Sequence, residues 1–430
     1  MDRPVDIQAD YIEKQLTYRI VPAKAQTFKI NGRVVSKTET IRTFTRVTSK
    51  VLAIPIGRTD LIPEGYEIVD KRINERVDWP SPTIPLNEFQ QPVYDELEDS
   101  SIINAGVGFG KTFTALHVAY KLGQKTLIVV HTLALRDQWL TEIDKMFGIK
   151  AGVIGAGIAR VDSPIVVANI QTLNKVKDKY AKMFGTIIVD EVHHSPSKTF
   201  SETLIVFHAR YYIGLSATLT RLDGKHVLFN NVFGDKVFTP QRSNVMEPRV
   251  EILQTNRHLT RDATHVQKMN DLLYDSTYQE FIAGLALVKM QLGYKVLITA
   301  ARIEFLNEVY RLIGEDNAVL ITGSSSDSKT QAQREALLDQ ITSGRKQCVV
   351  ASRSIFSEGI SLNALSCLIL AEPSGNASIL TQLIGRIMRL LEGKKQPVVV
   401  DIQFADSASR RTNTERMKVY LEEGWDIEYV

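Results

Sequence analysis

The sequence predicts an α/β protein with two tandem domains of similar design, preceded by a small β-rich domain. Short β-rich pieces with turn signals fill the first 80 residues, and two later regions each alternate apolar strand-like runs with helical stretches. The chain has 430 residues, more than a single hydrophobic core usually serves. We therefore expect an accessory domain over residues 1–80 and α/β domains over residues 86–240 and 241–430.

The accessory domain is predicted from short segments that favour strands. The pieces TYRIV, TFKI, RVVS, TIRTFTRV, KVLAIPIG and YEIVD alternate with turns such as Asn31-Gly32. They indicate a small antiparallel or mixed sheet. The stretch from Asp78 to Pro85 contains three prolines, which disfavour regular structure, so it predicts a linker.

The two α/β domains follow from repeated buried-strand patterns. In the first, TLIVVH, PIVVANI, TIIVDE and YYIGLSA are separated by amphipathic stretches such as Leu135–Met146. In the second, VLITA, AVLITG, QCVVAS, CLILAE and PVVVDI alternate with helical stretches such as Arg302–Ile313 and Ser328–Ile341. Continuous apolar strands between helices are typical of mainly parallel sheets covered by helices on both faces.

Composition limits the classes of protein that fit. The formal net charge is +3, so any nucleic-acid surface should be a local groove and not a polycationic face. The two cysteines, Cys348 and Cys367, lie in apolar runs and are expected to be reduced core residues that bind no metal. The N-terminus lacks a signal-like pattern and no apolar run is long enough to span a membrane, so we expect a soluble cytoplasmic protein, in the host cytoplasm if phage-encoded.

A glycine-rich loop between a predicted strand and a predicted helix indicates a nucleoside-triphosphate site. The segment AGVGFGKT follows the run SII and precedes FTALHVAY. Gly106, Gly108 and Gly110 allow backbone N–H groups to point at phosphates, Lys111 can neutralise β/γ charge, and Thr112 can hold Mg²⁺. ATP and Mg²⁺ are therefore the expected cofactors, although the first glycine of the general pattern is Ala105 here.

A second motif supplies carboxylates. The run TIIV ends in Asp190-Glu191, and the carboxyl end of a parallel strand lies beside such a loop. Asp190 is expected to hold Mg²⁺ through water and Glu191 to polarise the attacking water. Asp-Glu after a strand is often an ordinary turn, and it indicates a nucleotide site only together with the glycine-rich loop upstream. His193 and His194 follow, but consecutive side chains diverge, so we predict that His193 is a polar coupler and not a metal ligand.

A third motif, QLIGRIMR, places two arginines late in the second α/β domain. Arg386 and Arg389 are three residues apart and are predicted to share one helical face. Taken alone they could be a solvated basic face. A guanidinium pair can also stabilise charge on a transferring γ-phosphoryl group, and hydrolysis would then drive relative domain motion.

The ordered set AGVGFGKT, DEVH, SAT and QLIGRIMR resembles the superfamily 2 helicases and translocases, which have two RecA-like domains. The resemblance spans about Leu86 to Arg389 and implies an ATP hydrolase that moves on nucleic acid. It implies that Gln90 reads adenine and that Gly359 belongs to the nucleotide site. The remaining implied residues are nucleic-acid contacts at Thr132, Arg136, Gln171, Thr172, Thr322 and Ser354, and couplers at His193, Ser216, Thr218 and Gln382.

Two positions depart from the family's pattern: Ser361 stands where many relatives have Asp, and His131 replaces a usual proline. Trp139 ends the segment HTLALRDQW, which also contains Thr132. It could stack on bases, but its place beside an apolar helical stripe favours the core. The scattered Arg and Lys of the first 50 residues could dock duplex DNA or form a solvated face.

Finer resemblances point toward DNA. The segment GLSATLTRLDG, the pair DEVHH and the N-terminal β domain resemble DNA repair and branch-remodelling members, including phage recombination helicases of the UvsW type. This implies action on single-stranded and branched DNA in replication, recombination or repair, with no membrane partner. The alternatives are a duplex translocase that does not separate strands, an RNA helicase, and a scaffold that binds nucleotide without hydrolysis.

Overall fold

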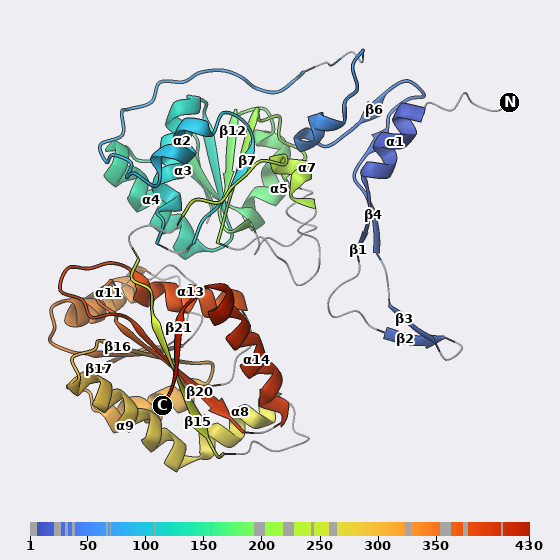
Figure 1. Cartoon of the computed structure of the whole chain (residues 1–430). Coiled ribbons are helices and arrows are strands. Elements are labelled where there is room, and N and C mark those ends of the chain that lie inside the picture. Colours follow the sequence, from blue (N-terminus) through green and yellow to red (C-terminus); the bar gives the residue numbers. More distant parts are fainter. Residues whose placement is uncertain are drawn as a thin grey trace. The chain divides into compact units, whose positions relative to one another are not determined.

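The computed structural model describes most of the chain. The described residues are 7–20, 27–30, 33–36, 39–65, 68, 70–106, 108–155, 157–192, 203–217, 228–241, 245–257, 265–322, 328–352, 363–372, 377–405 and 407–430. They form two compact units, Met1–Gln241 and Arg242–Val430 (Figure 1). Within those ranges, no helix has the length and apolar character needed to cross a bilayer.

The N-terminal segment contains three two-stranded antiparallel pairs and two unpredicted helices. The pairs are β1 with β4, β2 with β3, and β5 with β6. Their bounds are Thr17–Ile20, Glu39–Arg42, Thr27–Ile30, Arg33–Ser36, Thr45–Arg46 and Leu52–Ala53, and α1 (Ile7–Gln15) and the 3-10 helix η1 (Ile56–Leu61) complete the segment. Ile12 of α1 and Leu16, which directly follows α1, pack with Leu61 of η1 in a small buried cluster. The helices, and not the strand pairs alone, therefore supply the apolar centre.

The first α/β domain is built on an eight-stranded sheet of order β10-β9-β11-β8-β12-β13-β7-β14. All neighbours pair in parallel except β10 with β9. The strands are β7 (Ser101–Asn104), β8 (Thr126–Val130), β9 (Gly152–Gly155), β10 (Ile158–Arg160), β11 (Ile165–Asn169), β12 (Thr186–Val189), β13 (Tyr211–Ser216) and β14 (Val237–Phe238). The helices are α2 (Gln91–Glu96), α3 (Lys111–Leu122), α4 (Leu133–Phe147), α5 (Ile170–Tyr180) and α7 (Asn230–Phe233).

The second unit holds a seven-stranded parallel sheet of order β17-β18-β16-β19-β20-β15-β21. Its strands are β15 (Arg249–Thr255), β16 (Val296–Ala300), β17 (Ala318–Ile321), β18 (Cys348–Ser352), β19 (Cys367–Leu370), β20 (Val398–Phe404) and β21 (Asp426–Tyr429). Its helices are α8 (His265–Tyr274), α9 (Ser276–Gln291), α10 (Ile303–Ile313), α11 (Ser328–Thr342), α13 (Ala377–Met388) and α14 (Ser407–Glu422). Cys348 and Cys367 are free and buried, which confirms the predicted core thiols.

Residues 70–83, here called the strap, fasten the N-terminal segment to the first sheet. The Ile73 N–H donates to the His208 carbonyl at 2.7 Å, and the Val77 N–H donates to the Gly123 carbonyl at 2.9 Å. Trp79 Nε1 donates to the Gln124 carbonyl at 3.2 Å. These acceptors lie just before β8 and β13. The strap therefore crosses the amino edge of the parallel sheet and leaves the carboxyl edge for a site.

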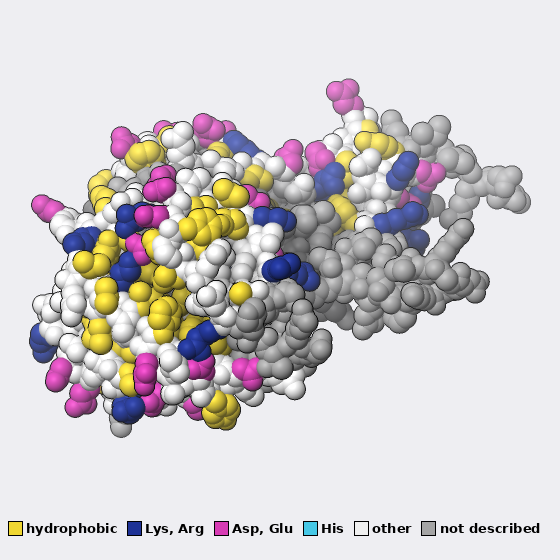
Figure 2. Space-filling model, turned by 60° about the horizontal axis from the view of Figure 1, so that its bottom comes forward, with side chains coloured by type: hydrophobic (Ala, Val, Ile, Leu, Met, Phe, Trp, Pro, Cys, Tyr) yellow, Lys and Arg dark blue, Asp and Glu magenta, His cyan; other side chains and the backbone are white. Residues whose placement is uncertain are grey.

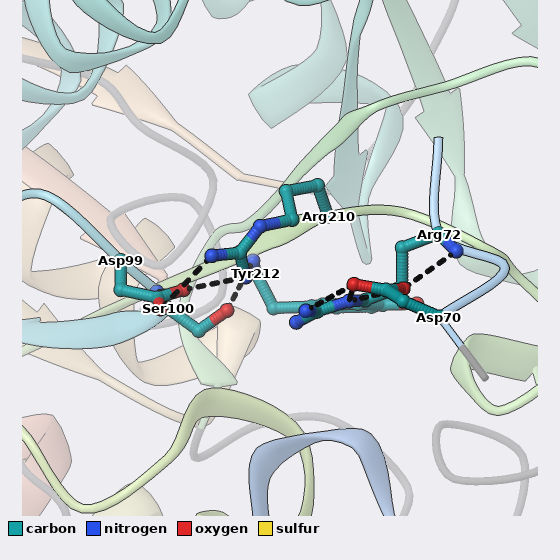
Figure 3. A network of polar contacts seen from close by, with 6 residues as sticks. All are labelled: Asp70, Arg72, Asp99, Ser100, Arg210 and Tyr212. Carbon is teal, nitrogen blue, oxygen red and sulfur yellow. Dashed lines mark hydrogen bonds and ion pairs between the residues drawn. The ribbon is translucent and has the colours of Figure 1, made fainter. Parts of the chain in front are cut away.

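Two ion pairs lie at this end of the sheet, one within the strap and one beside it (Figure 3). Arg72 pairs with Asp70 at 2.6 Å and holds the pKa of that carboxyl at about 2. Arg210, just before β13, pairs with Asp99, just before β7, at 3.3 Å. Ser100 Oγ accepts the backbone N–H of Tyr212 at 3.0 Å. The beginnings of two neighbouring strands are thus tied together beside the strap.

The face of the molecule shown in Figure 2 mixes both signs of charge, with hydrophobic side chains gathered between them. Helix α9 exposes Phe281 and Val288 in the second unit. Interspersed Lys, Arg, Asp and Glu are typical of a solvated surface and not of a phosphate-binding groove. The near-neutral composition is therefore visible on this face.

Candidate nucleotide and nucleic-acid site

The glycine-rich loop joins the carboxyl end of β7 to the first residue of α3. Gly108 and Gly110 have φ values of +91° and +86°, in the region that side chains with a Cβ rarely adopt. A Cβ on Gly110 would also lie 2.4 Å from Gln90 Nε2, so a larger residue there would displace the Gln90 amide as well as strain the backbone. Helix α3 has no side-chain cap, and its first amides are available to an anion.

Lys111 and Thr112 begin this helix, as the sequence predicts. Lys111 Nζ donates to the Ala105 carbonyl at 2.8 Å, so the ammonium group lies over the loop that carries it. Thr112 is half-buried in the first turn. Gly106 is described and half-buried, whereas Val107 lies outside the described residues. A positive group beside the uncapped first turn of a helix fits a polyphosphate.

Gln90 braces the loop from outside. Its Nε2 donates to the Phe109 carbonyl at 2.9 Å and its Oε1 accepts from the Asn87 N–H at 3.1 Å. The residue is buried, and both ends of its amide bind protein atoms. Its contact with adenine stays a prediction, and what the geometry adds is support of the loop's shape.

Asp190 and Glu191 follow β12. Asp190 Oδ2 accepts a hydrogen bond from Trp139 Nε1 at 2.8 Å. Burial raises the pKa of Asp190 to about 6 and the charge of Glu191 adds to the rise, while Trp139 and Lys111 oppose it. Among the described residues, Glu191 is the one non-glycine with positive φ, at +50°. Backbone strain of this kind concentrates at functional sites, which makes this turn a strong candidate.

Ser216 ends β13 beside the loop. The Ala105 N–H donates to the Ser216 carbonyl at 3.0 Å, so the predicted coupling motif begins against the base of the phosphate loop. Ser216 itself is buried. Thr218 and His193, the other predicted couplers of this domain, lie outside the described residues.

The predicted nucleic-acid contacts of this domain lie after β8 and β11. Thr132 caps α4, its Oγ1 accepting the Leu135 N–H at 3.2 Å. Gln171 is exposed and its Nε2 donates to the His131 carbonyl at 3.3 Å, while Thr172 follows it in the first turn of α5. Arg136 pairs with Asp137 at 2.7 Å.

Trp139, from the same helix, is not a stacking platform. Its side chain is buried, with 1% of the residue exposed. Stacking of Trp139 on bases is therefore wrong, and its assignment to the core is confirmed. The hydrogen bond to Asp190 could not be predicted, because no sequence spacing relates residues 139 and 190.

All these segments share one edge. Strands β7, β8, β11, β12 and β13 run parallel, and the loops at their carboxyl ends carry the glycine-rich loop, Thr132, Gln171, Asp190 and Ser216. This is the edge at which open α/β sheets bind ligands. The fold thus brings together residues that are far apart in sequence: Ala105 and Ser216 are separated by 111 positions.

In the second unit, Arg386 lies in the last turn of α13, but the helix ends at Met388. The prediction that Arg386 and Arg389 share one helical face is therefore wrong. Arg389 forms a β-bridge with Val245, and its carbonyl accepts from Lys394 Nζ at 2.7 Å, contacts that draw the chain out of the helix.

The Arg389 side chain has a partner that the sequence did not indicate. Its Nη1 donates to Asn363 Oδ1 at 3.4 Å. Lys394 also binds the Asn363 carbonyl at 2.9 Å, and burial beside Arg389 lowers the pKa of Lys394 to about 8. Gln382 lies within α13 and Thr322 directly follows β17. Ser354 and Gly359 lie outside the described residues.

Two family descriptions match the chain: the res subunit of type III restriction enzymes over residues 70–221, and the helicase conserved C-terminal domain over residues 278–390. The chain belongs to the superfamily 2 helicases and is an ATP-dependent helicase with two RecA-like domains.

Its relatives include phage proteins. It is 39% identical over 434 residues to "Probable helicase D10" of Escherichia phage T5, covering 98% of this chain and 93% of that protein. It is 28% identical over 352 residues to "ATP-dependent DNA helicase uvsW" of Enterobacteria phage T4, covering 74% and 68%. The DNA-bound structure of the ATP-dependent Type ISP restriction-modification enzyme LlaBIII matches with a TM-score of 0.58 at 13% identity, over 82% of this chain and 32% of that one, and agrees in fold.

Proposed function

We propose that this helicase hydrolyses Mg²⁺·ATP to move along DNA and to remodel branched DNA, by fork unwinding or junction branch migration, in replication, recombination or repair. The observation that carries the proposal is the shared carboxyl edge, which holds the phosphate loop, the Asp190-Glu191 pair and the strand-contact candidates Thr132 and Gln171. We take DNA over RNA as the track because the segment GLSATLTRLDG and the pair DEVHH resemble DNA repair and branch-remodelling helicases.

The nucleotide site fits ATP with Mg²⁺ by its own chemistry. The positive φ of Gly110 and the uncapped amides of α3 suit phosphate oxygens, and Lys111 adds a positive charge. Thr112 and Asp190 supply the oxygens that Mg²⁺ prefers. When bound, Mg²⁺ would screen the charge of the β- and γ-phosphates.

We assign the hydrolytic step to this chain's residues as follows. Glu191 orients and polarises the attacking water, held by a strained backbone that fixes where its side chain starts. Arg386 and Arg389 neutralise charge that develops on the γ-phosphoryl group, a role whose loss typically costs about 10³ to 10⁵ in rate. Ser216 and Gln382 couple this chemistry to the track.

The strand is held mainly through phosphates. Thr132, Gln171, Thr172 and Thr322 are neutral donors, and Arg136 is a cation already engaged by Asp137. Such contacts position a backbone without reading sequence, which agrees with a net charge of only +3. We therefore expect binding with little sequence preference.

The test is the ATPase rate with no polynucleotide, single-stranded DNA, blunt duplex, a four-way junction and RNA. We expect the junction and single-stranded DNA to stimulate hydrolysis, and Lys111→Ala to abolish it with an unchanged melting temperature. Retained hydrolysis in Lys111→Ala would remove the nucleotide assignment. Stimulation by RNA alone would overturn the DNA assignment, and stimulation by duplex without displacement of a labelled strand would identify a duplex translocase.

A further inference from the structure

Trp139 and Val129 hold Asp190 from the same segment of chain. The Asp190 N–H donates to the Val129 carbonyl at 3.0 Å, and the Asp190 side chain accepts from Trp139 Nε1 at 2.8 Å. Val129 lies near the end of β8 and Trp139 lies in α4. One stretch of eleven residues, 129 to 139, therefore anchors both the backbone and the carboxylate of Asp190.

One strand-contact candidate, Thr132, lies between these two anchor points, and a second, Gln171, contacts the same stretch from α5. Thr132 caps α4, and Gln171 of α5 donates to the carbonyl of the preceding residue, His131. Trp139 is seven residues beyond Thr132, which is two helical turns, so both lie on similar faces of one helix about 10 Å apart along its axis. A capped helix of 15 residues is a rigid connection, and a shift of its first turn is carried to the indole.

The indole fixes an orientation that the carboxylate would not keep alone. The terminal torsion of an aspartate side chain is broad, so a buried carboxylate needs a partner to hold its plane. A neutral N–H donor fixes the plane without cancelling the charge that a cation would bind. The other two tryptophans have different surroundings: Trp79 donates to a backbone carbonyl, and Trp425 Nε1 is buried with no acceptor among the described residues.

We propose that Trp139 is a positioning residue that sets the orientation of Asp190 for Mg²⁺ and links it to the nucleic-acid strand at the start of α4. This inference rests on the proposed function, because it takes Asp190 as a metal ligand and Thr132 and Gln171 as strand contacts. A nucleic-acid strand that moves residues 131–132 would reorient Asp190 through its hydrogen bonds with the Val129 carbonyl and the Trp139 indole. Binding of nucleic acid would thereby prepare the nucleotide site of the same domain for Mg²⁺.

The test compares Trp139→Phe with Trp79→Phe. The second variant is a matched control, because it also deletes an indole N–H hydrogen bond, the one from the strap to the Gln124 carbonyl. Loss of a group that orients a metal ligand typically weakens metal binding about 10- to 100-fold. In Trp139→Phe we expect the Mg²⁺ concentration for half-maximal ATPase to rise about tenfold or more, and the stimulation by single-stranded DNA to fall at least about threefold. Trp79→Phe should keep both values. Unchanged values in Trp139→Phe would overturn the proposal.

A readout independent of turnover uses the protein with Trp79→Phe and Trp425→Phe, in which Trp139 is the sole tryptophan. Its emission should change when Mg²⁺ and ADP are added, and again when single-stranded DNA is added to that complex. Emission that responds to nucleotide but not to DNA would overturn the link to the strand. This protein retains Trp139, so it provides the test even if Trp139→Phe does not fold. A wild-type protein that is not stimulated by any DNA would instead contradict the proposed function, an outcome recognisable before any variant is made.

Discussion

Asp190 in the first α/β domain and Asp401 in the second are both buried carboxylates on parallel sheets, but they have different partners. Asp190 follows β12 and accepts from the neutral indole of Trp139. Asp401 lies within β20, pairs with the buried guanidinium of Arg416 at 2.9 Å and accepts from the Tyr420 hydroxyl at 3.1 Å. Burial raises the pKa of both carboxyls. In the second unit a cation of the protein offsets that cost, and in the first a neutral group holds the carboxylate at the ligand-binding edge.

The same contrast extends to neighbouring groups. In the second unit, Glu251 of β15 is buried and paired with Lys289 of α9. In the first unit, Glu191 has a strained backbone at the end of a strand. Two sheets of similar design therefore use buried charge for different purposes. In the second unit internal pairing ties a helix to a strand, and in the first the carboxylates lie at the carboxyl edge of the sheet, where ligands bind.

The largest expected effect comes from exchanging a carboxylate for an amide in each domain. Glu191→Gln should lower kcat about 10³-fold, because a general base contributes about 10² to 10⁴. It should not lower the melting temperature, since it removes a charge that opposes ionisation of the buried Asp190. Glu251→Gln, which leaves Lys289 buried without its counter-charge, should lower the melting temperature. ATPase assays and thermal unfolding of both proteins measure the contrast, and equal loss of stability in the two would contradict it.

Asp401→Asn tests whether the second domain depends on its buried pair. The Asp401 and Arg416 side chains are 0% and 1% exposed, and removal of one partner of such a pair typically costs about 3–5 kcal/mol of unfolding free energy. Leu at 401 combined with Met at 416 should recover most of that loss, because no charge is then left buried. A double variant as unstable as Asp401→Asn would show that shape, and not charge, is what matters there.

The two cysteines give a measurement specific to that domain. Both are buried in β18 and β19, and burial raises the pKa of Cys367 to about 12. Thiol labelling at pH 8 therefore requires the domain to open. Asp401→Asn should be labelled at a lower denaturant concentration than the wild-type protein, while Glu191→Gln should be labelled like the wild type.

Much of the fold could be predicted because the strands that carry the motifs are buried on both faces. Continuous apolar runs such as those of β8, β12 and β16 need no partner to be recognised. The strand-loop-helix order located the glycine-rich loop, and the end of the apolar run TIIV located Asp190-Glu191. Strand β15 was not predicted, because Glu251 interrupts its apolar pattern. That carboxylate is stabilised in the interior by Arg249 and by Lys289, which is 38 positions away.

The parts that could not be predicted depend on contacts distant in sequence. Helical spacing suggested one face for Arg386 and Arg389, but a bridge to Val245 and a bond from Lys394 end the helix between them. The hydrogen bond from Trp139 to Asp190 likewise needs the β8–α4 and β12 segments to be assembled. Local patterns predict elements, while partners of buried polar groups require the tertiary structure.

The smallest expected effect concerns the surface pair Arg210–Asp99 beside the strap (Figure 3). Its side chains are 25% and 61% exposed, and exposed pairs are typically worth about 0–1 kcal/mol. A double-mutant cycle with Arg210→Gln and Asp99→Asn should therefore give a coupling below about 1 kcal/mol, decreasing with added salt. The strap would remain attached, because Ile73 and Val77 bind the sheet through backbone N–H groups that these changes leave intact. A coupling as large as that of the buried Asp401–Arg416 pair would contradict this reasoning, since it would mean that solvent does not screen the amino edge of the first sheet.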